Sequence, residues 1–440
     1  MTALGLGRRK SIATFSEEAQ FADMTTVRRH RPDYQIVLYM GLLMLIGLVI
    51  MYAIGPQRAN VLNNAYGSNY DSTYFFAKQM YSLGFALAAF AALALIPYTW
   101  ITRHAGKLIM IALGACALLA IASWTHWGIA QQSLGATRWF NFGALGSLQP
   151  AEMLKFAILI FTAGFLGTKA KQGKLNDTES TLIPLAVLTG ISLLFIVIIQ
   201  KDLGTGISLV SIIATMLLAG GINIKNTAII SIAIVVIGGL MIVSAPHRME
   251  RMMAFLKGDD TSISGDTDSY HVDQAKLSIG SGGLFGVGVG NSVQSTGYLP
   301  EAINDSVFAI MGETFGFVGL VTILVLFVAL LMRLLKIMDH LVDVRLKLLV
   351  AGVFGWFGAH VILNVASMIG IVPLTGITLP LLSFGGTSML FITAALGLVF
   401  QLSHYTVHPS RLKEARHEDF SSRRGIGRSR HTGRSGFTRA

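Results

Sequence analysis

Long apolar runs dominate this chain, and each is about as long as a helix that crosses a lipid bilayer. A spanning helix takes about 20 residues, because the hydrocarbon core is about 30 Å thick. Only 13% of the residues are charged, against about 25% in soluble domains. Ten runs qualify, at residues 36–54, 74–96, 108–124, 153–167, 182–199, 205–220, 227–243, 306–331, 348–369 and 377–402. The sequence therefore predicts an all-α polytopic membrane protein with about ten transmembrane helices.

The Lys and Arg residues indicate the orientation of the chain, because loops rich in these residues stay in the cytoplasm. With the N-terminus inside, the cytoplasmic tails and loops hold 25 of the 34 Lys and Arg residues. An even number of spans then returns the C-terminus to the same side. We interpret the net charge of +11 as a topology signal with some attraction to anionic lipid heads, and we expect no nucleic acid as partner.

Three regions follow from this plan. Residues 1–34 form a polar cytoplasmic tail in which we find no cleavable signal peptide. Residues 35–403 form the membrane domain, with a large outer loop at 244–305 between predicted helices 7 and 8. Residues 404–440 form a basic tail that we predict to be disordered. The single cysteine, Cys116, excludes a disulfide framework and a cysteine-based metal cluster.

Charged side chains gather at the outer ends of the predicted spans, where a charge persists mainly if it faces a cavity or a partner. The set comprises Arg138, Glu152, Lys155, Asp202, Glu301 and Asp305. Glu152 and Lys155 lie three residues apart, on one helical face, and could also be a simple ion pair at a helix start. Cations bind phosphate oxygens well, and a carboxylate can act as general base towards a sugar hydroxyl. The set favours a site for an anionic, lipid-borne substrate.

Two segments each allow two interpretations. The run IGSGGLFGVGVGNS at 279–292 could cradle a phosphate, or its glycines could permit tight packing at the membrane surface. The run IGIVPLTGITLPLLSFGGTS at 369–388 could be a broken, re-entrant segment or a kinked helix packed on small residues. Walker-type loops, HExxH and a strict GxGxxG are absent from the sequence, so nucleotide chemistry has no support.

Four ordered blocks resemble the signature blocks of the SEDS family of peptidoglycan glycosyltransferases, which includes the FtsW, RodA and SpoVE branches. They are GATRWFNFG with LQPAEMLKF, then QKDLGTG, then GSGGLFGVGVGNSVQSTGYLPEAINDSVFAIMGETFGFVG, and last NVASMIGIVPLTGITLPLLSFGGTS. The resemblance covers residues 35–403 and is closer to the FtsW cell-division branch. It implies a ten-span enzyme of the bacterial plasma membrane that polymerises lipid II at the outer leaflet and releases undecaprenyl pyrophosphate.

The resemblance also implies roles for individual residues. Asp305 in PEAINDSVF matches the family's proposed catalytic aspartate, a candidate general base. We predict that the other members of the charged set bind substrate: Arg138, Glu152, Lys155, Asp202 and Glu301. Arg138 and Lys155 would offset charge on the pyrophosphate, or would instead orient Glu152. We assign the histidines, including His271 in the outer loop, only structural or surface roles.

Several residues depart from the family pattern. Lys201 replaces the usual proline, Asn304 and Ser306 flank Asp305, and Thr314 follows Glu313 in place of a second acid. These departures keep the carboxylate of Asp305 but put in doubt any role that needs a second acid near Glu313.

Cofactors and partners follow from the same resemblance. We predict no resident cofactor or metal site in the chain, although Mg²⁺ or Mn²⁺ would suit the hard oxygens of a pyrophosphate. The expected partners are lipid II, a class B penicillin-binding protein with transpeptidase activity, other cell-division proteins and membrane lipids. Two other functions stay open. A flippase or transporter would place its charges near the bilayer midplane, and a noncatalytic scaffold would only recruit the transpeptidase.

Overall fold

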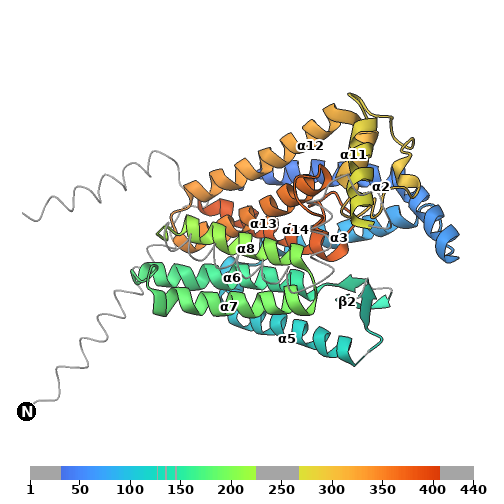
Figure 1. The fold of residues 1–440 in the computed structure, drawn as a ribbon. Coiled ribbons are helices and arrows are strands. Elements are labelled where there is room, and N and C mark those ends of the chain that lie inside the picture. The colour runs from blue at the N-terminus through green and yellow to red at the C-terminus, as the bar shows by residue number, and fades with distance from the viewer. Residues whose placement is uncertain (1–30, 126, 134–135, 144–145, 224–266, 407–440) are drawn as a thin grey trace, which may run out of the picture.

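A computed structural model describes residues 31–125, 127–133, 136–143, 146–223 and 267–406. Figure 1 shows a bundle whose long helices have roughly aligned axes. Eight helices in the described part are long and apolar enough to cross a membrane. They are α2 (Tyr34–Tyr66), α3 (Tyr74–Leu95), α5 (Ala105–Trp124), α6 (Pro150–Lys171), the segment Thr178–Ile199, α12 (Val307–His340), α13 (Val344–Met368) and the segment Gly386–Tyr405, which contains α14 (Gly386–Leu402). The prediction of a helical, polytopic membrane protein is confirmed.

The remaining elements are short. A shorter apolar helix, α8 (Leu203–Ala219), matches the sixth predicted span. The segment Thr178–Ile199 contains α7 (Ile183–Leu193) between two π-helical turns. Two further helices are α4 (Tyr98–Arg103) and α11 (Thr267–Ser281), and single 3₁₀ turns lie at Gln294–Thr296 and Ser403–Tyr405. The predicted seventh span, 227–243, lies outside the described residues, so the count of ten and the position of the large loop stay predictions.

Helices α2 and α12 extend well beyond their predicted bounds of 36–54 and 306–331. Helix α2 has 33 residues and α12 has 34, which at about 1.5 Å per residue exceeds a core of about 30 Å. Hydropathy detects only the part of a helix that lies in hydrocarbon, and therefore it misses the polar turns that project from the bilayer.

A small sheet follows α5 and was not expected from the sequence. Strands β1 (Ala130–Ser133), β2 (Ala136–Asn141) and β3 (Ser147–Leu148) are antiparallel in the order β1-β2-β3. Figure 1 places β2 and α11 at the same end of the bundle. This sheet carries Arg138 and leads directly into α6.

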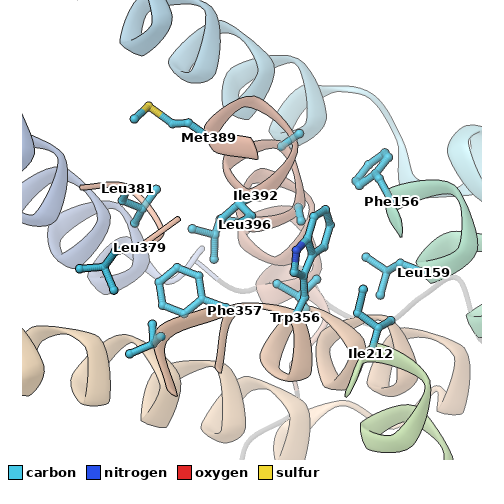
Figure 2. Packing of buried hydrophobic residues seen from close by; sticks show 14 of the residues in the cluster. Phe156, Leu159, Ile212, Trp356, Phe357, Leu379, Leu381, Met389, Ile392 and Leu396 are labelled. Atoms are coloured by element: carbon cyan, nitrogen blue, oxygen red, sulfur yellow. The ribbon is translucent and has the colours of Figure 1, made fainter. Parts of the chain in front are cut away.

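Helix α13 lies at the centre of the core. Its glycines permit close approach to α8, since a Cβ on Gly355 would lie 2.2 Å from Oγ1 of Thr215. Figure 2 shows Trp356 of α13 with Leu396 of α14 on one side and Leu159 of α6 on the other. The packing fixes the position of α13, and with it the polar residues on its last turns.

The glycine-rich run pairs with a break in α12. Gly316 has φ 66° and ψ −168°, a conformation that only glycine adopts readily. The carbonyls of Glu313 and Thr314 accept from the amides of Val287 and Gly288 at 2.9 and 3.1 Å. The amides of residues 317 and 318 donate in turn to the carbonyls of residues 283 and 284, at 2.8 and 3.1 Å. The glycines therefore serve tight backbone packing, which is one of the two interpretations of this run.

The chain between α13 and α14 is not helical from Gly370 to Gly385. The last span was predicted to begin at residue 377, but α14 begins at Gly386. The broken-segment interpretation is therefore correct. Leu379, Leu381 and Leu382 in this segment are buried. Its backbone is bonded to the rest of the protein, because the amide of Phe384 donates to the carbonyl of Ile303 at 2.8 Å.

Candidate functional site

Glu152 and Lys155 form a buried ion pair at the start of α6. Pro150 occupies the first turn of the helix, where its missing N–H costs nothing, and Glu152 follows in the same turn. Lys155 Nζ lies 2.8 Å from Glu152 Oε1, with side chains 0% and 3% exposed. The two residues thus form an ion pair at a helix start, as the simpler interpretation held. Because the pair is buried away from water, its stability depends on the groups around it.

Helix α13 supplies those groups. Lys155 Nζ lies 4.9 Å from the centre of the Trp356 ring, and 3.2 Å from Nε2 of His360. The indole N–H of Trp356 also donates to this Nε2, at 3.3 Å. Because both neighbours are donors, Nε2 is the acceptor, and Nδ1 carries the proton that is donated to the carbonyl of Thr378 at 3.3 Å. His360 is therefore neutral and joins the ion pair to the segment after α13.

Asp202 caps α8 and links it to the start of α6. Its Oδ1 accepts from the amide of Thr205 at 3.0 Å, and its Oδ2 accepts from Oγ1 of Thr205 at 2.8 Å. Oδ2 also accepts from Nε2 of Gln149, the residue just before α6, at 2.9 Å. The carboxylate is 8% exposed and interacts electrostatically with Glu152. These bonds give Asp202 a positioning role at the junction of two helices.

Arg138 on β2 holds the turn before Asp202. Its Nε donates to the carbonyl of Gln200 at 3.2 Å, and a terminal nitrogen donates to that of Lys201 at 2.8 Å. Lys201 has φ 53°, which is uncommon for a residue with a Cβ. The guanidinium thus stabilises a strained turn by binding its carbonyls, and it remains partly exposed.

Asp305 lies in the turn directly before α12, and two side chains fix its backbone. The side-chain amide of Asn364 donates to the carbonyl of Asp305 at 2.7 Å and to that of Ile377 at 2.8 Å. The next residue, Ser306, donates its hydroxyl to the carbonyl of Pro300 at 2.8 Å and therefore accepts from Nε2 of His271, 2.5 Å away. Asn364 and Ser306 are fully buried, and His271 is 7% exposed.

Glu301 begins the same turn. Its φ is 49°, and its carbonyl accepts from the amides of Asn304 and Ser306 at 2.9 and 3.3 Å. Its carboxylate is exposed and accepts from the side-chain amide of Asn304. Glu301 therefore shapes the loop that carries Asp305 and presents its own charge to solvent.

One turn of α13 connects the two halves of the site. His360 and Asn364 lie four residues apart, on one helical face. His360 binds Lys155 and Thr378, and Asn364 binds the backbone of Asp305 and Ile377. The structure thus brings Glu152, Lys155 and Asp305 onto one continuous network, although Lys155 and Asp305 are 150 residues apart in the sequence.

A family model described as "Cell cycle protein", which covers FtsW, RodA and SpoVE, matches residues 34–408. The chain belongs to the FtsW/RodA/SpoVE family. It is 31% identical over 385 residues to "Stage V sporulation protein E" of Bacillus subtilis, covering 87% of this chain and 99% of that protein. It is also 31% identical over 373 residues to a "Probable peptidoglycan glycosyltransferase FtsW" of Taylorella equigenitalis, covering 83% of this chain and 95% of that one.

Solved structures share the fold. A chain from a structure named "Structural coordination of polymerization and crosslinking by a peptidoglycan synthase complex" superposes with a TM-score of 0.66 at 23% identity, over 84% of this chain and 97% of that one. Thermus thermophilus RodA superposes with a TM-score of 0.59 at 23% identity, over 86% of this chain and 98% of that one. At this identity the two structures establish the fold of this FtsW/RodA/SpoVE protein.

Sequence reasoning missed three residues of the network in this family member: His271, His360 and Asn364. The last two are polar side chains four residues apart within an apolar span, and such residues usually face a partner or a cavity. That signal could have identified them. His271 gave no such signal, because its partner Ser306 lies 35 residues away and the contact depends on how α11 packs against α12.

Glu313 has a structural role. Its carboxylate accepts from the hydroxyl of Ser292 at 2.6 Å and from the amide of Val293 at 2.9 Å, and the residue is 2% exposed. These bonds hold the loop that follows the glycine-rich run.

Proposed function

We propose that this chain is a peptidoglycan glycosyltransferase that polymerises lipid II at the outer leaflet during cell division. Several relatives are named probable peptidoglycan glycosyltransferase FtsW, and they match most of the chain. The observation that carries the proposal is the position of Asp305, a carboxylate in a turn whose backbone is fixed by Asn364 and Ser306 at the start of α12.

In this proposal Asp305 is the general base. Its carboxylate takes the proton from the 4-hydroxyl of the acceptor sugar, and that oxygen attacks the anomeric carbon of the donor lipid II. A new C–O bond forms as the bond from this carbon to the pyrophosphate breaks. Undecaprenyl pyrophosphate leaves with its electron pair, and the anomeric configuration inverts. A fixed base contributes because the reacting atoms are held close together before the reaction begins.

The other charged residues divide into two groups. Lys155 has no exposed surface and Glu152 has almost none, so in this conformation they act as positioning residues together with Asp202. Arg138 and Glu301 are at least partly exposed, so their side chains can contact the substrate. Arg138 is the cation that suits the pyrophosphate, since guanidinium binds phosphate oxygens well.

A divalent cation would be held mainly by the substrate. Among the described residues no group of three or more His, Cys, Asp or Glu side chains is arranged to hold a metal ion. Mg²⁺ or Mn²⁺ prefers hard oxygens, and the pyrophosphate would supply most of them. Bound there, the cation would offset charge on the leaving group. Asp305 and Glu301, four residues apart in the sequence, are the carboxylates near this proposed position.

We also propose the partners and the orientation. One solved structure with this fold is named for the coordination of polymerisation and crosslinking, which supports a class B penicillin-binding protein as the transpeptidase partner. Other cell-division proteins would join the same complex. The distribution of Lys and Arg supports an orientation with both termini in the cytoplasm and Asp305 outside.

The decisive experiment is polymerisation of labelled lipid II by the purified protein in lipid vesicles, with its transpeptidase partner present. Asp305→Asn should lower the rate at least about 100-fold, the usual contribution of a general base. Asp273→Asn is the matched control, because it removes an exposed carboxylate on neighbouring α11, where its ion pair with Lys276 is half exposed. Equal rates for wild type and Asp305→Asn would place the base elsewhere. If neither protein makes glycan strands while a reference enzyme is active in the same assay, the result would favour the transporter or scaffold function.

A further inference from the structure

A basic pocket lies where three helices meet at one end of the bundle. It is formed by the chain before α2, the last turns of α12 and the end of α14, and its volume is about 370 Å³. Small-molecule sites usually measure about 300–1,000 Å³. Asp305 precedes the first turn of α12, whereas this pocket lies at the last turns of the same helix. The pocket is therefore separate from the proposed active site.

Cations outnumber carboxylates in this pocket. One stripe of α12 contributes two cations, Arg333 and Lys336, and one turn further on the imidazole of His340, with the spacing i, i+3 and i+7 that keeps side chains on one face. Arg31, in the chain before α2, also lines the pocket. Asp33 is the one carboxylate of the lining, and it is paired with Nε of Arg333. The pocket therefore holds more positive charges than its single carboxylate can neutralise. The negative end of the α12 dipole stabilises these cations, because they lie at the last turns of the helix.

The walls of the pocket are fixed by hydrogen bonds. The amide of Asp33 donates to Oγ of Ser403 at 2.9 Å, and Oδ1 of Asp33 accepts from the amide of Gln35 at 3.1 Å. A β-bridge between Leu341 and Thr406 joins the end of α12 to the chain after α14. A site that is already ordered loses little entropy when it binds a ligand.

Apolar side chains continue from the pocket along the membrane-facing surface. Tyr34 lines the pocket and is 65% exposed, and Leu38, one turn further along α2, is 56% exposed. Met332 on α12, beside Arg333, is 58% exposed. A ligand that fits both surfaces carries an anionic head and a long apolar chain.

We propose that this pocket binds the phosphate headgroup of an anionic phospholipid, with its acyl chains along α2 and α12. Arg31, Arg333 and Lys336 would contact the phosphate oxygens, which cations of this kind bind well. Basic pockets between transmembrane helices on the cytoplasmic side commonly hold such headgroups. The predicted orientation places this end of α12 in the cytoplasmic leaflet. The inference does not depend on the proposed enzyme activity.

The test is binding of phosphatidylglycerol to the purified full-length protein in detergent, measured by native mass spectrometry and by the shift in thermal unfolding. Lys336→Gln and Arg31→Gln should each weaken binding about fivefold, the typical contribution of one cation near a lipid surface. Neither residue takes part in the pair between Asp33 and Arg333, and Lys336 is exposed, so both variants should fold.

Lys171→Gln is the matched control. It removes an exposed lysine from the end of α6. This end of α6 lies at the same end of the bundle as the pocket, as shown by the packing of Gly167 against Arg345 at the start of α13. This variant should bind phosphatidylglycerol as tightly as the wild type does. Phosphatidylcholine should not displace phosphatidylglycerol from the wild-type protein. Equal losses in Lys171→Gln and Lys336→Gln would overturn the pocket in favour of general charge attraction. Competition by soluble glycerol phosphate as strong as that by the lipid would overturn the phospholipid assignment.

Discussion

The side-chain amide of Asn364 donates to the backbone carbonyl of Asp305 at 2.7 Å and to that of Ile377 at 2.8 Å. One buried amide thus connects the turn that holds Asp305 to the broken segment after α13. A carboxylate used as a base must keep its place relative to the substrate, because small displacements cost rate. Asn364 is therefore a positioning residue for the proposed chemistry.

Replacing this amide should affect the rate more than substrate binding. Asn364→Ala removes both hydrogen bonds and leaves the buried carbonyl of Ile377 and the part-buried carbonyl of Asp305 without this donor. A buried group left without a partner costs about 1–3 kcal/mol. We expect kcat for lipid II polymerisation to fall about tenfold or more while KM changes little, and Asn364→Ser to recover part of the loss. A folded Asn364→Ala protein with the wild-type rate would contradict the positioning role.

The buried ion pair predicts a strong coupling between its members. Lys155→Met leaves the carboxylate of Glu152 buried without its cation, and breaking such a pair costs about 3–5 kcal/mol. The double variant Glu152→Gln with Lys155→Met should recover most of this loss, because no buried charge remains. Thermal unfolding of the four proteins in the same detergent measures the coupling. An exposed pair would give at most about 1 kcal/mol, and a value that small would show that water reaches the pair.

The sequence identified the parts of the molecule that depend on local patterns. Hydropathy located α3, α5 and α13 to within a few residues, and the spacing of Glu152 and Lys155 correctly indicated a shared helical face. What it missed depends on contacts between distant segments. The break at Gly316 is stabilised by amides of residues 287 and 288, and no window around Gly316 contains them.

The same limit applied to the candidate site. The charged residues were found because a charge near a membrane span is conspicuous. Their partners were not found, because neutral side chains such as Asn364 and Ser306 are ordinary in a sequence and gain a role only through packing. Arg138 illustrates the difference, since its sequence position suggested Glu152 as a neighbour and the structure shows it bound to the carbonyls of Gln200 and Lys201.

The pair of His271 and Ser306 should act as one unit. Ser306 accepts from His271 and donates to Pro300, so either His271→Ala or Ser306→Ala interrupts the same connection between α11 and the turn that holds Asp305. We expect each variant to lose about 1–2 kcal/mol of stability, and the double variant to lose clearly less than their sum. His271→Gln, which keeps a side-chain N–H, should retain more polymerisation activity than His271→Ala. Strictly additive losses in thermal unfolding would show that the two side chains act independently.

The break in α12 should not tolerate a side chain at Gly316. A Cβ at this position would lie 2.3 Å from the amide nitrogen of Gly286 and 2.6 Å from the carbonyl of Leu284. The backbone conformation alone costs a residue with a Cβ about 1–3 kcal/mol, and the clash adds to that cost. Gly316→Ala should therefore unfold at a clearly lower temperature than the wild type and should accumulate poorly in the membrane. The side chain would separate α12 from the glycine-rich run and break the four backbone hydrogen bonds that now join them.

Gly114→Ala is the control for this substitution. Gly114 lies within α5, and a Cβ there would meet nothing within 4 Å. Because alanine favours a helix interior over glycine by about 0.5–1 kcal/mol, this variant should be as stable as the wild type or slightly more stable. If Gly316→Ala were equally stable, α12 would have to run straight through residue 316, and the amides of residues 287 and 288 would need other acceptors.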